Sequence, residues 1–215
     1  MKKTIILVAL IFVSIVTIAQ TKYGVRAGMT LSTYASAQSN YEFKPGVHIG
    51  GVADIPLGSS KFSFVPGVYL ADKGTKINSD DSYEDASVPV YYYKEVNYNY
   101  QLEIPLLFTY KIPINEKLSL KPQIGAYISY GLFQIIKGKR DYLGIVSQNY
   151  PTEYTSYHYF YEDNSFSLSY GGNLGLSAFY NKYSFTLSCD VGSLFGSRLL
   201  HYPDICMFFS LGYTF

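Results

Sequence analysis

The sequence predicts an all-β fold, an eight-stranded antiparallel up-and-down transmembrane β-barrel with short periplasmic turns and long extracellular loops. Three observations predict it. Apolar and polar residues alternate with a period of two along most of the chain. Short and long connections alternate between these segments, as they do in membrane barrels. Only 15% of the 215 residues are charged while 18% are aromatic, whereas a typical soluble domain is about 25% charged.

The amino terminus predicts export. Lys2 and Lys3 precede an apolar run over residues 5–19, and Ala19 stands at a plausible cleavage point. We therefore expect a signal peptide at 1–19 and an outer-membrane β-barrel domain at 20–215. The alternative is an uncleaved anchor, but 15 apolar residues fall short of the roughly 20 that a spanning helix needs. No cysteine follows Ala19, so a lipoprotein signal is not expected.

The first three strands are expected at about residues 23–33, 44–55 and 61–73. The clearest strand follows at 97–110, where Tyr98, Leu102 and Phe108 share one face while Asn97 and Gln101 share the other. The pattern continues at 118–130 and at about 166–180, 183–192 and 204–215. Eight strands result, which is an even number, as membrane barrels of this type require.

The connections place both chain ends on the periplasmic side. Those near 56–60, 112–116 and 181–182 are short, and those near 34–43, 74–94, 131–165 and 193–203 are long. A lysine follows each short turn, where it can reach water at the interface: Lys61, Lys117 and Lys182. Proline cannot donate to a strand ladder, so we expect bulges or weakened pairing at Pro66, Pro105 and Pro122.

The polar face decides between a membrane barrel and a soluble, lipocalin-like barrel. A water-facing side should carry many lysines and glutamates, but this one carries Ser, Thr, Asn, Gln and Gly, which suit a crowded lumen. The opposite face is uniformly large and apolar. The sequence therefore predicts lipid outside and a filled polar lumen inside, at the cell outer membrane.

A small polar network is predicted in the lumen. Its members are Arg26, His48, Asp54, Glu103, Lys121 and Asp190. Charges confined in a lumen are costly unless paired, so we expect a structural plug of salt bridges, with a proton or ion path as the alternative. Cys189 and Cys206 have opposite parity in one hairpin, which favours two free thiols over a disulfide.

The outer loops are rich in tyrosine. The candidate binding surface comprises Tyr91, Tyr92, Tyr93, Tyr150, Tyr154, Tyr157, Tyr159 and Tyr161. Tyrosine is enriched in recognition surfaces, because its ring gives rigid, amphipathic contact area. The alternative is that the rings pack together or extend the aromatic belt above the bilayer. The long 131–165 segment could also form extra strands that protrude from the membrane.

Catalysis is not predicted. His201 lies near Ser193, Ser197 and Asp204 in the sequence, but spacing alone is weak evidence for a triad, because geometry defines one. The acidic run at 78–85 lacks the spacing of an EF-hand calcium loop. We therefore expect no catalytic residue, no cofactor and no metal site, with an outer-membrane lipid-modifying enzyme as a further alternative.

Four segments resemble the PorT-like outer-membrane β-barrel proteins of Bacteroidetes, which are Gram-negative. They are residues 23–32, the Lys-Gly exit at 71–76, the Tyr-Gln-Leu-Glu-Ile-Pro-Leu-Leu motif at 100–107 and the closing strand at 210–215. Gln101 departs from the family's usual Asn or Asp before its Tyr-Leu pair. The resemblance implies an eight-stranded barrel without cofactor, whose terminal Phe215 strand is read by the barrel-assembly machinery.

The expected function is binding at the cell surface through the outer loops. The partners expected are outer-membrane lipid and an extracellular ligand. No nucleic acid is expected, because a net charge of +1 provides no basic excess for phosphates. The alternative is a membrane component of a protein-secretion or assembly complex, which the family's namesake suggests.

Overall fold

Every regular element in the described chain is a β-strand. The computed structural model describes residues 21–34, 40–79, 90–142, 153–159, 168–195 and 203–215. Its strands are β1 (Lys22–Tyr34), β2 (Tyr41–Glu42), β3 (Lys44–Pro56), β4 (Phe62–Ser79), β5 (Val90–Tyr110), β6 (Ile112–Pro113), β7 (Leu118–Tyr142), β8 (Glu153–Tyr159), β9 (Leu168–Tyr180), β10 (Tyr183–Phe195) and β11 (Pro203–Thr214). Among these residues no helix is long and apolar enough to cross a membrane. The predicted signal peptide lies outside them.

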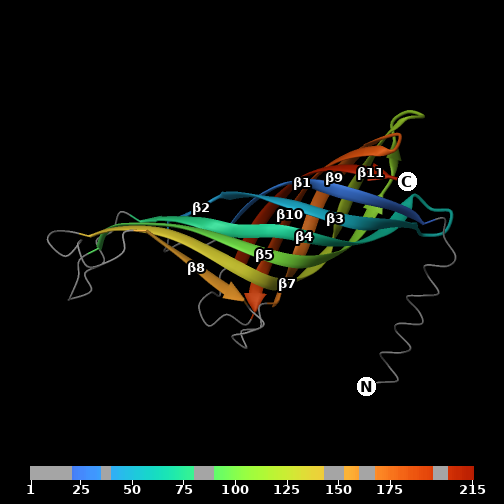
Figure 1. The fold of residues 1–215 in the computed structure, drawn as a ribbon. Coiled ribbons are helices and arrows are strands. Elements are labelled where there is room, and N and C mark those ends of the chain that lie inside the picture. Colours follow the sequence, from blue (N-terminus) through green and yellow to red (C-terminus); the bar gives the residue numbers. More distant parts are fainter. Residues whose placement is uncertain (1–20, 35–39, 80–89, 143–152, 160–167, 196–202) are drawn as a thin grey trace, which may run out of the picture.

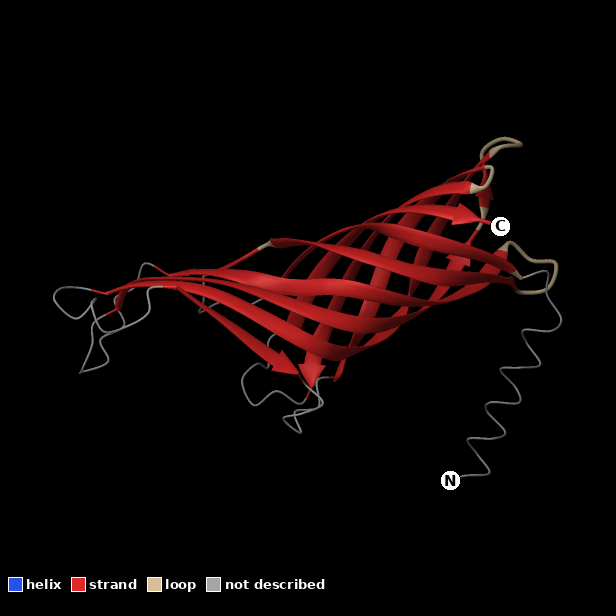
Figure 2. Ribbon diagram, viewed as in Figure 1, coloured by secondary structure: helices blue, strands red, loops and turns tan. Residues whose placement is uncertain are grey.

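Eight of the strands close into a ring (Figures 1 and 2). The order is β1–β3–β4–β5–β7–β9–β10–β11 and back to β1, and every pairing is antiparallel. The remaining strands add to this ring: β2 pairs with β4, while β6 and β8 pair with β7. The predicted eight-stranded antiparallel barrel is confirmed.

One end of the barrel, the turn end, carries the short connections. They span residues 57–61, 111–117 and 181–182, and two of them turn through positive φ, at Gly58 (64°) and Asn181 (54°). The carboxyl terminus lies at the same end, where the Phe215 amide donates to the Tyr23 carbonyl. The three lysines after the turns are exposed, as predicted. We call the opposite end the loop end.

Three strands run past the barrel at the loop end. β4, β5 and β7 have 18, 21 and 25 residues, whereas β1, β3, β9 and β10 have 13 each. The loops predicted over 74–94 and 131–165 are therefore wrong in extent, because much of each is strand. The prediction of extra strands within 131–165 is confirmed by the end of β7 and by β8. Beyond the lipid both faces of a strand meet polar surroundings, so the period-two pattern fades although the ladder continues.

These projecting segments form one sheet, which we call the extended sheet. It consists of residues 74–79 of β4, 90–99 of β5 and 133–142 of β7, together with β2 and β8. Figure 1 shows it leaving the barrel towards the left of the view. In the described chain β2 and β8 are its two edges, since each pairs with one neighbour.

The barrel is polar inside and apolar outside. Large apolar side chains such as Val47, Ile124 and Leu174 are 63%, 63% and 66% exposed, while Thr30, Ser129 and Ser177 are buried. A soluble barrel would bury the first set and expose the second. The predicted assignment of the faces is confirmed, and the apolar outer face is the surface that lipid covers.

Two prolines interrupt the ladder as expected. The β3–β4 pairing skips from Val52–Gly67 to Ile55–Phe64, and the gap includes Pro66. The β4–β5 pairing skips from Pro66–Leu106 to Tyr69–Glu103, and the gap includes Pro105. On the β5 side of β7, Pro122 falls between the end of the β5 ladder and the short β6 ladder.

Both cysteines are free, as predicted. Cys206 is buried inside the barrel, whereas Cys189 is partly exposed on the opposite face. Their register explains this: Cys206 faces Asp190 across the hairpin, so the neighbouring Cys189 has the other parity.

At the loop end β4 leaves β3 and crosses the barrel mouth against β1. The β3–β4 ladder begins only at His48–Ala71. Above it, the Thr30 hydroxyl donates to the Asp72 carbonyl at 2.7 Å, and the Ser32 hydroxyl donates to the Gly74 carbonyl at 2.8 Å. Thr30 and Ser32 are lumen-facing residues of β1. To reach them, β4 passes beneath β3, on the lumen side of that strand.

Gly46 makes this crossing possible. A Cβ atom there would lie 2.4 Å from the Asp72 carbonyl oxygen, closer than atoms can approach. Because Gly46 has no side chain, the backbone of β4 can pass directly beneath β3 and lie against β1 at the mouth of the lumen.

Candidate functional site

A buried cluster of charges occupies the lumen, centred on Lys73 of β4. Its Nζ atom lies 2.5 Å from Glu103 Oε2 of β5 and 2.8 Å from Asp190 Oδ2 of β10. All three side chains are buried. One cation thus ties two carboxylates from opposite walls of the barrel.

Neighbouring polar and aromatic side chains surround this cluster. The Asn173 amide donates to Asp190 Oδ1 at 2.5 Å, and the Tyr127 hydroxyl donates to Asp204 Oδ1 at 3.1 Å. The Lys73 ammonium also lies 4.4 Å from the centre of the Tyr127 ring. A cation held over an aromatic face gains further stabilisation when it is removed from water.

The predicted lumen residues all lie inside, but not in one group. Glu103 and Asp190 meet through Lys73. Asp54 and Lys121 form a separate ion pair nearer the turn end. The His48 ring bonds to the Ser210 hydroxyl at 2.8 Å.

Arg26 lines a small hollow beside Glu103 and Tyr69. That hollow has a volume of about 20 Å³, and the next one towards the turn end has about 10 Å³. A cavity needs at least about 10–15 Å³ to hold one water. The lumen is therefore filled by side chains, which favours the plug over a path for ions.

Sequence reasoning missed four charged residues of the interior: Lys44, Asp72, Lys73 and Asp204, all buried. Lys73 shares the parity of Ser63 and Tyr69, which face the lumen, so the alternation could have placed it there. Asp204 likewise shares the parity of Cys206. The Lys44–Asp72 pair, with 2.7 Å between Nζ and Oδ1, exists only because β4 crosses beneath β3. Alternation within one strand carries no trace of that crossing.

The described tyrosines of the candidate binding surface lie on both faces of the extended sheet. Tyr157 and Tyr159 of β8 are 62% and 44% exposed and stand opposite Ile135 and Phe133 of β7. Tyr154 lies on the other face, and its hydroxyl donates to Glu95 Oε2 at 2.8 Å. Tyr91, Tyr92 and Tyr93 belong to β5, whereas Tyr150 and Tyr161 lie outside the described residues.

Of the four residues considered for a catalytic triad, the structure describes Ser193 and Asp204. His201 and Ser197 lie outside the described residues, and Asp204 is a buried partner of Tyr127. Most of the acidic run at 78–85 also lies outside them. The part of the chain that the structure describes contains no group of three or more metal-binding side chains.

The family of the chain follows from a sequence comparison. Residues 18–196 match the model of the outer membrane protein beta-barrel domain. The chain belongs to this family. It is accordingly an outer-membrane β-barrel protein, and the predicted location is confirmed. A comparison with curated proteins finds no match.

Solved outer-membrane proteins resemble the chain weakly. Ail, the attachment invasion locus protein of Yersinia pestis, is 13% identical over 90% of this chain and 98% of its own, with a TM-score of 0.42. Neisserial surface protein A is 13% identical over 90% and 97%, with a TM-score of 0.44. A major outer membrane protein from Thermus thermophilus is 16% identical over 91% and 100%, with a TM-score of 0.45. Similarity at this level carries no information about function.

Proposed function

We propose that this protein is a non-catalytic interaction protein of the outer membrane, in which a filled barrel anchors the extended sheet and presents it to partners outside the cell. The carrying observation is the length of β7. A membrane-spanning strand takes about 9–11 residues, and β7 has 25. The excess of about 14 residues corresponds to roughly 45 Å of strand, far more than the closure of a small barrel needs.

The orientation follows the general pattern of such barrels, with short turns towards the periplasm and long segments outside. The turn end is then periplasmic and the extended sheet extracellular. A cysteine introduced at Tyr157 should react with a membrane-impermeant maleimide on intact cells. A cysteine introduced at Tyr183 should react only after the outer membrane is permeabilised. The two native thiols should contribute little, since Cys206 is buried and Cys189 faces the lipid.

Tyrosines on the extended sheet are the proposed contact residues. Tyr157 and Tyr159 offer exposed rings, and β5 contributes the run Tyr91, Tyr92 and Tyr93. Rings of this kind bury large area at low entropic cost, which suits recognition. The competing interpretation is that the β8 rings only extend the aromatic belt towards lipid headgroups.

A photo-crosslinking amino acid at position 157 separates these interpretations. We expect it to capture a discrete protein on intact cells, whereas the same substitution at Tyr183, which is 65% exposed at the turn end, should not capture that protein. Replacing residues 140–160 with a short linker should abolish its binding while the heat-modifiable gel migration of a folded barrel persists. Adducts with lipid alone at position 157 would contradict the proposal.

A role in a secretion or assembly complex is the second candidate. It rests on the resemblance of residues 100–107 to the PorT-like motif, a finer assignment than the family match. In this case the protein captured at position 157 is itself a secretion component, and deletion of residues 140–160 impairs secretion. If secretion is unchanged by the deletion, this candidate fails.

A further inference from the structure

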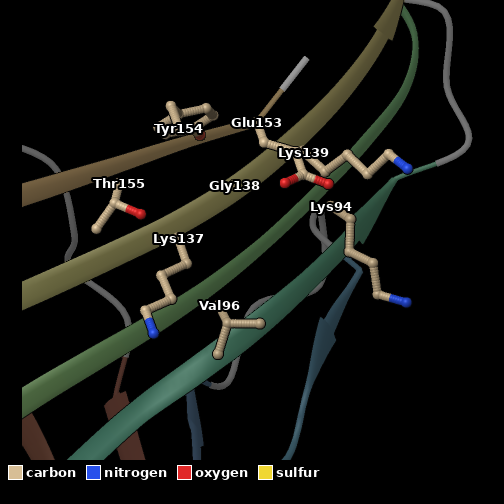
Figure 3. A pocket seen from close by; sticks show the side chains of 8 residues that line it. All are labelled: Lys94, Val96, Lys137, Gly138, Lys139, Glu153, Tyr154 and Thr155. Carbon is tan, nitrogen blue, oxygen red and sulfur yellow. The ribbon is translucent and has the colours of Figure 1, made fainter. Parts of the chain in front are cut away.

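Three lysines gather on one face of the extended sheet, around the hollow shown in Figure 3. They are Lys94 of β5 and Lys137 and Lys139 of β7, and all are exposed. We call them the lysine face. Lys94 stands directly opposite Lys139, and Val96 stands opposite Lys137. The lysines therefore share the side of the sheet that continues downward into the lipid-facing side of the barrel.

The opposed ammonium groups of Lys94 and Lys139 repel each other, and a bound anion would relieve this repulsion. Like charges directly opposite each other on neighbouring strands destabilise a sheet. Glu153 of β8 stands opposite Lys139 on this face, and Asp141 of β7, opposite Tyr92, has the same strand parity as Lys139. Further across the sheet, Glu42 stands opposite Lys76 and balances that lysine. Counted over the three lysines, Glu153 and Asp141, a net positive charge of about one remains on this part of the face.

The nearest acid on β5 is directed elsewhere. Glu95 stands opposite Gly138, on the other face of the sheet. There it accepts the hydrogen bond from the Tyr154 hydroxyl, whose ring lies over Gly138. The contact fixes β8 against β7 and keeps the Glu95 carboxylate on the face opposite the lysines.

An aromatic band lies immediately below the lysine face. Tyr100 stacks on Phe133 with 4.5 Å between ring centroids, and Phe133 lies 6.3 Å from Tyr159. The Lys137 ammonium lies 5.6 Å from the Tyr98 ring centre. Rows of aromatic rings mark the boundary between hydrocarbon and headgroups in membrane barrels.

The distances along the strands place the lysines at headgroup depth. Lys137 is level with Val96, two residues beyond Tyr98, and Lys94 and Lys139 are four residues beyond it. At about 3.4 Å per residue and a tilt of about 40°, these positions lie roughly 5–10 Å above the band. The headgroup layer extends about 5–8 Å on each side of the hydrocarbon core, so Lys137 lies within it, and the long side chains of Lys94 and Lys139 can reach it from just above.

The hollow between the lysines can accept a headgroup. It has a volume of about 390 Å³ and is lined also by Val96, Thr155 and the backbone at Gly138. Sites for small molecules span roughly 300–1,000 Å³. Its chemistry combines ammonium donors and a hydroxyl above with apolar and aromatic surface below.

We infer that the lysine face binds the phosphorylated headgroup of a glycolipid in the outer leaflet. The acyl chains would lie along the apolar outer face of the barrel, and the phosphates would neutralise Lys94, Lys137 and Lys139. Because this inference places Tyr159 at the lipid boundary, lipid adducts at position 157 are expected beside the protein adduct, and only the protein adduct tests the proposed partner. The inference uses the orientation of the extended sheet, which maleimide labelling tests separately.

Native mass spectrometry of the full mature barrel, titrated with bisphosphorylated lipid A, tests the inference. We expect binding that is at least about tenfold weaker for enzymatically dephosphorylated lipid A and weakens as salt is raised. Lys94→Gln, Lys137→Gln and Lys139→Gln together should weaken binding of bisphosphorylated lipid A by about tenfold to a hundredfold. The matched control removes three exposed lysines at the turn end, Lys61, Lys111 and Lys117, and should leave affinity unchanged.

Several outcomes would overturn the inference. One is equal affinity for the two forms of lipid A in the unmodified protein, a result that needs no variant to fold. Others are unchanged binding in the lysine-face variant or an equal loss in the control. Competition by inorganic pyrophosphate at concentrations comparable to the lipid would identify a site for free phosphate and would exclude the glycolipid.

Discussion

At the scale of residues, the lumen is held by a few buried charges that satisfy one another. Asp190 is completely buried, and it accepts hydrogen bonds from Lys73 and Asn173. A buried ion pair adds little stability over a well-packed apolar pair, but removing one partner leaves a charge without compensation. The Lys73 cluster is therefore sensitive to single substitutions.

Replacing Lys73 with methionine should destabilise the barrel by about 3–5 kcal/mol, because Glu103 and Asp190 would both lose their counter-charge. The folded fraction can be followed by heat-modifiable gel migration across a urea series in vesicles, since the chain has no tryptophan to report unfolding. Adding Glu103→Gln and Asp190→Asn should restore much of the loss. Lys61→Met, at the exposed turn end, serves as the control. An unfolding midpoint for Lys73→Met equal to that of the control would contradict this interpretation.

Alternation allowed most lumen residues to be predicted one at a time. Arg26, His48, Glu103, Lys121 and Asp190 were placed inside by parity alone. The contacts among them could not be predicted, because these depend on which strands face each other across the lumen. Lys73 joins β4 to both β5 and β10, and no local pattern specifies that meeting.

At the scale of elements, the extended sheet depends on how β8 is attached to β7. The attachment relies on Gly138, over which the Tyr154 ring lies. The sequence suggested extra strands here but not their limits. Apolar alternation reports burial on one face, and beyond the lipid neither face is buried in apolar surroundings. The ends of β4, β5 and β7 were therefore underestimated.

Gly138→Ala should loosen β8, because the new Cβ atom would lie 2.2 Å from the Tyr154 ring. We expect amide hydrogen exchange in residues 153–159 to accelerate by about tenfold or more while exchange in β9 and β10 is unchanged, as local opening predicts. Gly172→Ala is the matched control, since the nearest atom to its added Cβ lies 3.9 Å away. Unchanged exchange in β8 would show that the ring is not held in place over Gly138.

At the scale of the whole molecule, the described part of the chain divides into a barrel filled by side chains and an extended sheet. Two barriers stand in the lumen. The Lys73 cluster joins opposite walls, and β4 crosses the mouth against β1 through Thr30 and Ser32. The alternation of polar and apolar residues along a strand does not reveal the second barrier, because this barrier arises where β4 leaves β3 at Gly46.

The two barriers together predict a barrel that does not conduct ions. Purified protein in planar bilayers should give no stable conductance steps, because the lumen hollows of about 20 and 10 Å³ each hold about one water. Lys73→Ala should remain non-conducting, since the Thr30 and Ser32 contacts bind the backbone of β4 and do not involve the deleted side chain. Combining Lys73→Ala with Thr30→Ala and Ser32→Ala should also give no stable conductance, because the backbone of β4 and the other side chains that fill the lumen are unchanged. Steady conductance in the unmodified protein would instead assign the lumen charges to an ion path.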